Sequence, residues 1–241
     1  MANDRQVTIL IPTMFDSRYI IELCLETIRK YSTYPYRIIV GNNGVDEETC
    51  AYLHIQKDIK LADIPEAHRN TPKDYLASLV ETDYYFFLHD DVQILRNEWL
   101  ERRVKIMEER DTNAIVGETG LNYGAKFPFY IFKSRLRRFF PMGMLVKTVA
   151  AKELNLGWGI VKDKFDTGGY AYQQFLAQKK WKFKHFPFKY DIRHFGEMTW
   201  PVKKKLKNEK TPLDLDKLIE IRKQKIELIK DILNKQKHYT Q

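Results

Sequence analysis

Cysteine is nearly absent from the sequence, which has only Cys24 and Cys50 among its 241 residues. Both fall in segments whose apolar periodicity predicts helices, which argues against a disulfide framework and favours two buried thiols in a reducing compartment. No apolar run approaches the roughly 20 residues of a membrane span, and the first residues lack a charged-then-apolar leader. We therefore expect a cytoplasmic protein, with peripheral attachment to the inner face of a membrane left open.

Glycine is also scarce, and Gly117 and Gly120 lack the spacing of a phosphate-binding loop, so the sequence carries no dinucleotide fingerprint.

Charged residues, in contrast, are plentiful, and they are unevenly distributed between the two halves of the sequence. Residues 1–120 carry 21 acidic and 14 basic side chains, whereas residues 121–241 carry 11 acidic and 27 basic ones. The resulting net charges of −7 and +16 indicate an anionic partner for the second half: nucleic acid, membrane phosphate or a phosphorylated small molecule.

The first half alternates short β-branched or aromatic runs with amphipathic segments. Helices are predicted to begin near residues 17, 46, 71 and 98, and strands are predicted at 7–12, 37–40, 57–64, 84–88 and 114–117. This alternation predicts an α/β fold with a mostly parallel central sheet flanked by helices.

The second half has a more irregular, aromatic and basic texture. It predicts helices near 146–154 and 170–180, a half-exposed strand over 181–190, and an amphipathic helix over 213–235 that follows the lysine cluster at 203–207. The last helix has three interpretations, which are packing on the domain, pairing in a homodimer, or docking on an anionic membrane through the lysines.

Three of the predicted strands end in residues that interrupt the apolar run. These residues are the pairs Pro12-Thr13, Asn42-Asn43 and Asp90-Asp91. Ligands bind beyond the carboxyl ends of the strands in sheets of this kind, so we expect the site there. Two adjacent carboxylates are costly to bring together unless a cation or hydrogen-bond donors offset their charge. A divalent metal at Asp90 and Asp91 is the functional interpretation, and a helix cap or solvated turn is the structural one.

The succession of these segments resembles the family 2 glycosyltransferases with the GT-A fold. Residues 7–13, 40–44, 70–81 and 84–92 occur in the order and spacing of that family, over about 7–118 and more loosely over 141–196. The resemblance implies one GT-A domain over 1–200, with a nucleotide-binding half at 1–118 and an acceptor-side half at 119–200, and a C-terminal helical appendage. Residues 201–241 form that appendage as a basic linker and an amphipathic helix.

The resemblance also implies a reaction. The chain would transfer a sugar, hexosyl-like and with inversion, from a nucleotide-diphosphate donor to a hydroxyl acceptor, with a divalent cation as cofactor. The expected donor is a UDP-sugar, and the acceptor is a glycan, a lipid-linked glycan or another hydroxyl compound.

Individual roles follow only where residues match the family's motifs. Pro12 and Thr13 match the end of the first strand, which borders the nucleotide. Asn42 stands where the family has an aspartate that reads the base, and Asn43 follows it. An amide presents donors as well as acceptors, which leaves the choice of base open.

The tripeptide at 89–91 matches the family's Asp-any-Asp signature, with His89 in place of the first acid. Asp91 is therefore the expected metal ligand, and Asp90 is expected to support it or to contact the ribose. His194 matches the late histidine that binds the same metal in many GT-A enzymes. A carboxylate, an imidazole and phosphate oxygens suit Mn²⁺ better than Mg²⁺.

The catalytic base departs from the family, because the usual Glu-Asp pair is absent from residues 164–174. Asp166 is the expected base, and a helix N-cap is its alternative role. Glu118 and Glu197 are held in reserve. If none serves, the enzyme is retaining, or the protein binds nucleotide sugars without efficient transfer.

A third possibility is a nucleic-acid-binding protein that uses the basic second half together with its aromatic residues. We rank it last and expect no nucleic acid partner, because no recognised nucleic-acid module is present and the acidic first half would repel phosphate.

Overall fold

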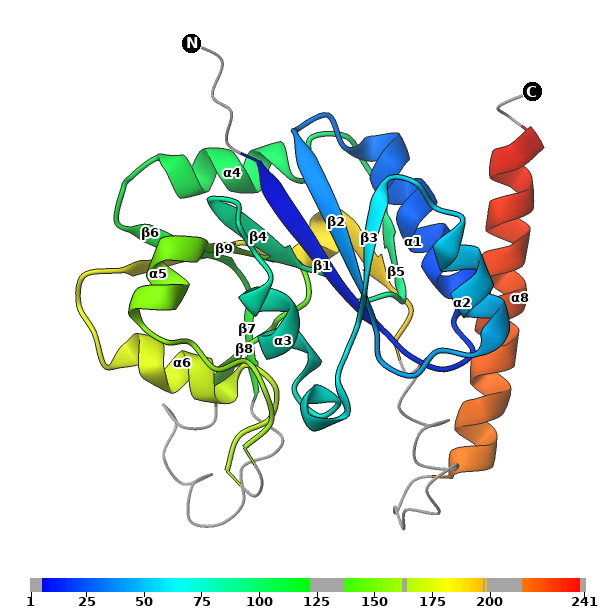
Figure 1. Cartoon of the computed structure of the whole chain (residues 1–241). Coiled ribbons are helices and arrows are strands. Elements are labelled where there is room, and N and C mark those ends of the chain that lie inside the picture. Colours follow the sequence, from blue (N-terminus) through cyan, green and yellow to red (C-terminus); the bar gives the residue numbers. More distant parts are fainter. Residues whose placement is uncertain (1–5, 122–136, 162–163, 197, 199–213, 239–241) are drawn as a thin grey trace.

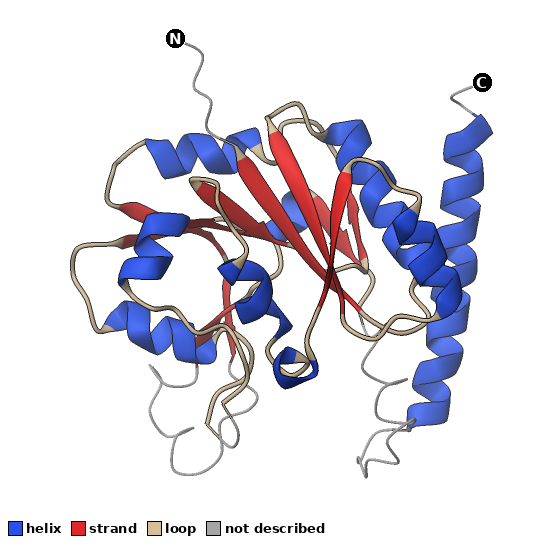
Figure 2. Ribbon diagram, in the orientation of Figure 1, coloured by secondary structure: helices blue, strands red, loops and turns tan. Residues whose placement is uncertain are grey.

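The computed structural model describes residues 6–121, 137–161, 164–196, 198 and 214–238 (Figures 1 and 2). Its helices are α1 (Arg18–Tyr31), α2 (Glu47–His54), α3 (Pro72–Ser78), α4 (Glu101–Glu108), α5 (Thr148–Glu153), α6 (Gly169–Leu176) and α8 (Leu215–His238). Its strands are β1 (Val7–Thr13), β2 (Tyr36–Asn42), β3 (Ile59–Asp63), β4 (Tyr84–Phe87), β5 (Val92–Ile94), β6 (Asn113–Gly117), β7 (Thr119–Leu121), β8 (Arg137–Phe139), β9 (Met144–Lys147), β10 (Lys182–His185) and β11 (Ile192–His194).

A seven-stranded sheet in the order β10-β6-β9-β4-β1-β2-β3 forms the centre of the molecule. The pairs β1–β2, β2–β3, β1–β4 and β6–β10 are parallel, whereas β9 runs antiparallel between β4 and β6. This confirms the predicted α/β class with a mostly parallel sheet. The cysteines, in α1 and α2, are both free.

Alternate residues of the strands supply two separate apolar cores. Ile9 and Ile11 of β1 and Phe86 of β4 pack on one face of the sheet with α1, α2 and α4. Leu10 and Phe87, their neighbours along the same strands, pack on the other face with α3, α5 and α6. All five side chains are fully buried. A strand buried on both faces reads as a continuous apolar run, which is why these strands were predictable.

The predicted helix at 146–154 is wrong at its start, because residues up to Lys147 form β9 and the helix α5 begins at Thr148. The run at 144–146 is apolar and buried, and such a short run is compatible with either a strand or a buried helix segment. The strand predicted over 181–190 is also shorter, ending at His185.

Helix α8 packs along α1, on the side of the molecule where Figure 1 shows both helices. Ile229 and Leu233 are buried against Ile20 and Leu23 of α1 and against Met198. Packing on the domain, one of the three predicted arrangements, is therefore present. The lysine cluster at 203–207 lies outside the described residues. Among those described, no helix is long and apolar enough to span a bilayer.

A second, two-stranded sheet joins β11 to β5 in antiparallel register, with His194 opposite Val92. Asp191, just before β11, is fully buried. Its Oδ2 accepts a hydrogen bond from Nη1 of Arg103 at 2.8 Å, and its Oδ1 accepts one from Nη1 of Arg102 at 2.8 Å. Helix α4 thus anchors the start of β11 beside the end of β5, where the amide of Leu95 donates to the carbonyl of Asp191 at 2.8 Å.

Candidate functional site

The strands β1, β2 and β4 end at one edge of the sheet, and a cavity of about 540 Å³ opens beside the ends of β1 and β4. The residues that line it come from several elements. They include Pro12 near the end of β1, Lys73 of α3, residues 89–91, Arg138 of β8 and His194 of β11. This cavity lies beyond the carboxyl ends of the strands, where ligands bind in sheets of this kind.

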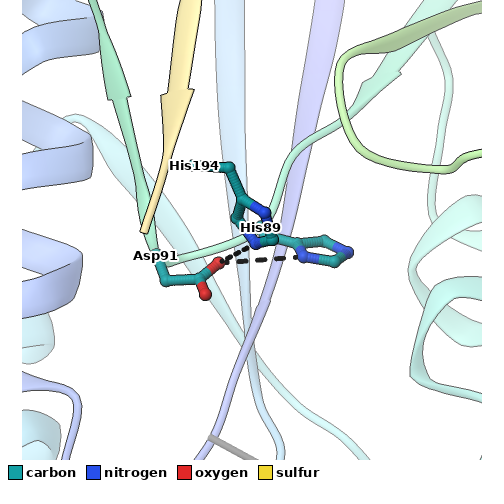
Figure 3. A group of neighbouring side chains, drawn as sticks. All are labelled: His89, Asp91 and His194. Carbon is teal, nitrogen blue, oxygen red and sulfur yellow. Dashed lines mark ion pairs between the residues drawn. The ribbon is translucent and has the colours of Figure 1, made fainter. Parts of the chain in front are cut away.

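Three side chains converge at the cavity wall (Figure 3). Oδ1 of Asp91 lies 3.1 Å from Nε2 of His194 and 3.7 Å from Nδ1 of His89. The ligand atoms of the three residues all lie within 4.8 Å of one another. Within the described part of the chain, this buried carboxylate oxygen accepts no well-oriented hydrogen bond. One carboxylate and two imidazoles converging in this way fit a divalent cation.

Local packing explains how residues about a hundred positions apart meet here. His89 and Asp91 leave β4 at a turn whose start is fixed by a 3.0 Å hydrogen bond from Leu88 N to Leu10 O. His194 is carried by β11, and the amide of Phe195 donates to the carbonyl of Asp91 at 2.9 Å. The backbone that holds the acid is therefore bonded directly to the backbone that holds the histidine.

The electrostatics of the cluster leave it ready to bind a cation. Burial, with the charge of Lys73, lowers the pKa of His89 to about 3, so its imidazole is neutral near pH 7. Burial acts to raise the pKa of Asp91, but the approach of the His194 and His89 imidazoles to its Oδ1 outweighs burial and holds that pKa below its usual value. The cluster therefore presents an ionised carboxylate beside a neutral imidazole, and both forms bind metals.

Asp90 belongs to the same loop but serves a different contact. Its Oδ2 accepts a hydrogen bond from Oγ1 of Thr13 at 2.6 Å, so it faces the end of β1. Burial and the adjacent charge of Asp91 raise the pKa of Asp90 to about 7. Asp90 also lines the cavity. Thr13 and Asp90, both predicted to lie beside the nucleotide, are thus in direct contact.

Three cationic residues, Arg69, Lys73 and Arg138, line the same cavity. Nζ of Lys73 lies 3.4 Å from Nε2 of His89, and burial lowers the pKa of Lys73 to about 8. Arg138 has two further arginines close by in the sequence, of which Arg135 lies outside the described residues and Arg137 is exposed. Sequence reasoning missed Lys73, although it falls within the segment 70–81 that resembles the family.

Asp166, the predicted base, is engaged on both oxygens. Its Oδ2 lies 3.0 Å from Nη1 of Arg138, and its Oδ1 accepts the backbone N–H of Thr167 at 2.8 Å. The alternative role as a helix cap is wrong, since α6 has Gly168 at its N-cap. The carboxylates that line the cavity, among the described residues, are those of Asp90 and Asp91.

The two reserve candidates for the catalytic base are Glu118 and Glu197. Glu118, between β6 and β7, does not line the cavity. Glu197 lies outside the described residues.

The asparagines after β2 shape a turn. Oδ1 of Asn42 accepts the backbone N–H groups of Gly44 and Val45, each at 3.1 Å, and its Nδ2 donates to Asp63 at 2.9 Å. Nδ2 of Asn43 donates to the carbonyl of Arg69 at 3.2 Å. Arg69 lines the cavity whereas the two asparagines do not. The structure thus brings Pro12, Asp90, Asp91 and His194 to the cavity, whereas Thr13, Asn42 and Asn43 are not among the residues that line it.

His89 is a potential ligand that sequence reasoning did not assign. The signal was its position, since it occupies the place of the first acid in the Asp-any-Asp pattern. In the sequence, a histidine at this position indicates that a carboxylate ligand has been lost. In the structure, its Nδ1 faces Oδ1 of Asp91, the same oxygen that His194 approaches.

No protein-family model matches the sequence, and no curated protein matches it either. Solved structures do. Residues 1–349 of S. aureus TarS share 14% identity over 90% of this chain and 69% of that one, with a TM-score of 0.56. The mannosyltransferase PcManGT of Pyrobaculum calidifontis, in complex with GDP-Man and Mn²⁺, shares 15% identity over 77% of this chain and 56% of that one, with a TM-score of 0.53.

A further structure of S. aureus TarS 1–349, in complex with UDP-GlcNAc, covers 90% of this chain with a TM-score of 0.51. At these identities the likeness establishes the fold. The chain has the GT-A fold, as its resemblance to family 2 glycosyltransferases predicted.

Proposed function

We propose that this protein is a metal-dependent glycosyltransferase that moves a sugar from a nucleoside-diphosphate donor to a hydroxyl acceptor. The observation that carries the proposal is the convergence of His89, Asp91 and His194 on one wall of a cavity at the carboxyl edge of a GT-A sheet. The two similar structures that hold UDP-GlcNAc, or GDP-Man with Mn²⁺, support a nucleotide-sugar donor and a divalent cation.

Asp91, His194 and His89 would hold the cation. Two imidazoles and one carboxylate suit a borderline first-row metal, whereas Mg²⁺ prefers oxygen ligands alone, so we propose Mn²⁺ over Mg²⁺. When bound, such a cation offsets the charge that develops on a departing nucleoside diphosphate.

The other residues of the cavity would bind and orient the donor. Lys73 and Arg138 supply positive charge for the diphosphate, and Arg138 has the planar guanidinium that suits phosphate oxygens. Asp90, held by Thr13, would accept a hydrogen bond from the ribose.

Pro12 would border the nucleotide at the end of β1, and the Asn42-Asn43 turn would border the base. We propose a UDP-sugar as the donor and a glycan, lipid-linked glycan or other hydroxyl compound as the acceptor.

The deprotonation of the acceptor is assigned to Asp166, with inversion at the sugar. Both of its oxygens are engaged, one by Arg138 and one by Thr167, so it would have to give up one of these contacts to accept a proton. This observation favours a second candidate function, which is a protein that binds nucleotide sugars and transfers them slowly.

We further propose that residues 1–200 form the transferase domain and 201–241 its appendage. The protein would work in the cytoplasm, and at the inner face of a membrane if its acceptor is lipid-linked.

A turnover assay distinguishes the two functions. The protein would be incubated with a panel of UDP- and GDP-sugars and simple glycan acceptors, with Mn²⁺ or with EDTA, and released nucleoside diphosphate would be quantified. We expect release from one donor, in Mn²⁺ only, that increases when the correct acceptor is present. Binding without release would favour the second function, and the absence of both would contradict the two together.

A further inference from the structure

Helix α8 has two parts with different contacts. Its C-terminal half supplies Ile229 and Leu233 to the cluster on α1. Its N-terminal half lies at the end of the molecule where β1 and β2 finish (Figure 1). There it carries two basic side chains, Arg222 and Lys225, whose hydrogen bonds are made to backbone and side-chain oxygens of other segments.

Arg222 bridges the two segments that border the cavity on this side. Its side chain is buried, and its Nε donates to the carbonyl of Met198 at 2.5 Å. Its Nη1 donates to Oδ2 of Asp16 at 2.9 Å, and its Nη2 donates to the carbonyl of Asp16. Met198 lines the cavity, and so does Met14, two residues before Asp16. One guanidinium thus ties the segment after β1 to the segment after β11.

Lys225 holds the backbone that directly follows His194. Its Nζ donates to the carbonyl of Phe195 at 2.6 Å and to the carbonyl of Gly196 at 2.9 Å. These residues follow the end of β11, where the amide of Phe195 still pairs with the carbonyl of Asp91 and Gly196 comes next. Gly196 has a φ of +63°, a left-handed conformation in which glycine is favoured. The ammonium group therefore stabilises a turn that carries a ligand of the candidate metal site at its start.

We propose that α8 positions the metal site, and that Arg222 and Lys225 are the positioning residues through which it acts on His194 and the cavity wall. The inference rests on the proposed metal-dependent function. Partners that orient a metal ligand change metal affinity by about 10- to 100-fold without touching the ion. The site would thus be complete only while α8 is docked on α1.

The test compares Lys225→Met with Lys223→Met, in the full-length protein. Lys223 is on the same helix, but its side chain is 68% exposed and faces Glu220 at 3.6 Å. Free Mn²⁺ would be measured by electron paramagnetic resonance during titration. We expect Lys225→Met to weaken Mn²⁺ binding about tenfold and Lys223→Met to leave it unchanged. Thermal unfolding should shift by less than about 3 °C in both.

Two additional readouts separate positioning from general stability. Lys225→Arg keeps a donor at the turn and should restore most of the Mn²⁺ affinity. Pulsed measurements of the nitrogen coupling between bound Mn²⁺ and imidazole should show a weakened contribution in Lys225→Met. If the wild-type protein binds Mn²⁺ and Lys225→Met binds it equally well, the positioning role of α8 is overturned, whereas the proposed function is not. If wild type binds no Mn²⁺, the proposed function is overturned with it.

Discussion

Replacing Asp91 by alanine should reduce Mn²⁺ binding by about 100-fold or more, since even the partners of metal ligands contribute 10- to 100-fold. Oδ1 of Asp91 is the atom that both imidazoles approach, at 3.1 Å and 3.7 Å. Its loss leaves two imidazole nitrogens without the carboxylate oxygen that they share. Manganese-dependent release of nucleoside diphosphate should disappear as well. Calorimetric titration with Mn²⁺ measures the first effect directly.

The fold should survive this substitution, because Oδ1 of Asp91 accepts no well-oriented hydrogen bond from the described residues. Circular dichroism of the variant would check this. Asp83→Ala is a matched control, since Asp83 is an exposed acid at the opposite end of β4. His89→Ala and His194→Ala should each weaken binding less than Asp91→Ala. Undiminished turnover or Mn²⁺ affinity in Asp91→Ala would refute the metal role of this residue.

Replacing Asp191 by alanine should lower the free energy of unfolding by about 3–5 kcal/mol, the usual cost of removing one partner from a buried ion pair. Arg103 is fully buried, and its Nη1 donates to Asp191 Oδ2 at 2.8 Å. Burial lowers the pKa of Arg103 to about 10, against the opposing effect of Asp191. Without Asp191 this guanidinium has no ion-pair partner among the described residues. Urea denaturation monitored by tryptophan fluorescence measures the loss.

Two further variants show whether the buried charge is the cause. Arg103→Met combined with Asp191→Leu removes both charges and should recover most of the lost stability, because an apolar pair of similar size often replaces a buried ion pair. Arg96 lies 3.6 Å from Asp191, but its side chain is 57% exposed, so Arg96→Ala should cost less than about 1 kcal/mol. A loss below 1 kcal/mol in Asp191→Ala would contradict the assignment of this pair as the support of β11.

The central strands were predictable because each is a run of apolar residues that packs on both faces of the sheet, as Leu10 and Ile11 do on opposite sides of β1. The edge of the sheet at which the candidate site lies was predictable from the polar residues that follow those runs. The strand β9 was not predictable, because the apolar run at 144–146 has no periodicity that separates a strand from a buried helix. Its partners, β4 and β6, are distant in sequence and decide its conformation.

The proximity of His194 to Asp91 was expected only from the family resemblance. The local pattern around His194 contains no sign of it, because the contact depends on the pairing of β11 with β5 and on the buried Asp191. The engagement of Asp166 by Arg138 is equally invisible in sequence, since the two residues come from different elements. Tertiary ion pairs of this kind determine which acids remain available for chemistry.

The uneven charge of the two halves is partly explained by the structure. Arg222 and Lys225 belong to the basic half, yet their side chains bind backbone carbonyls and Asp16 of the same chain. Arg138 instead lines the cavity and remains a candidate for the diphosphate. The excess of basic residues therefore serves the internal support of the site as well as an anionic ligand.

In the proposed function, a cation held by His89, Asp91 and His194 binds the nucleoside diphosphate of a sugar donor. The decisive measurement is calorimetric titration of the wild-type protein with UDP and GDP, once in Mn²⁺ and once in EDTA. One of the two nucleotides should bind in Mn²⁺, and its binding should be lost in EDTA. Equal affinity in both buffers, or no binding of either nucleotide in Mn²⁺, would contradict it.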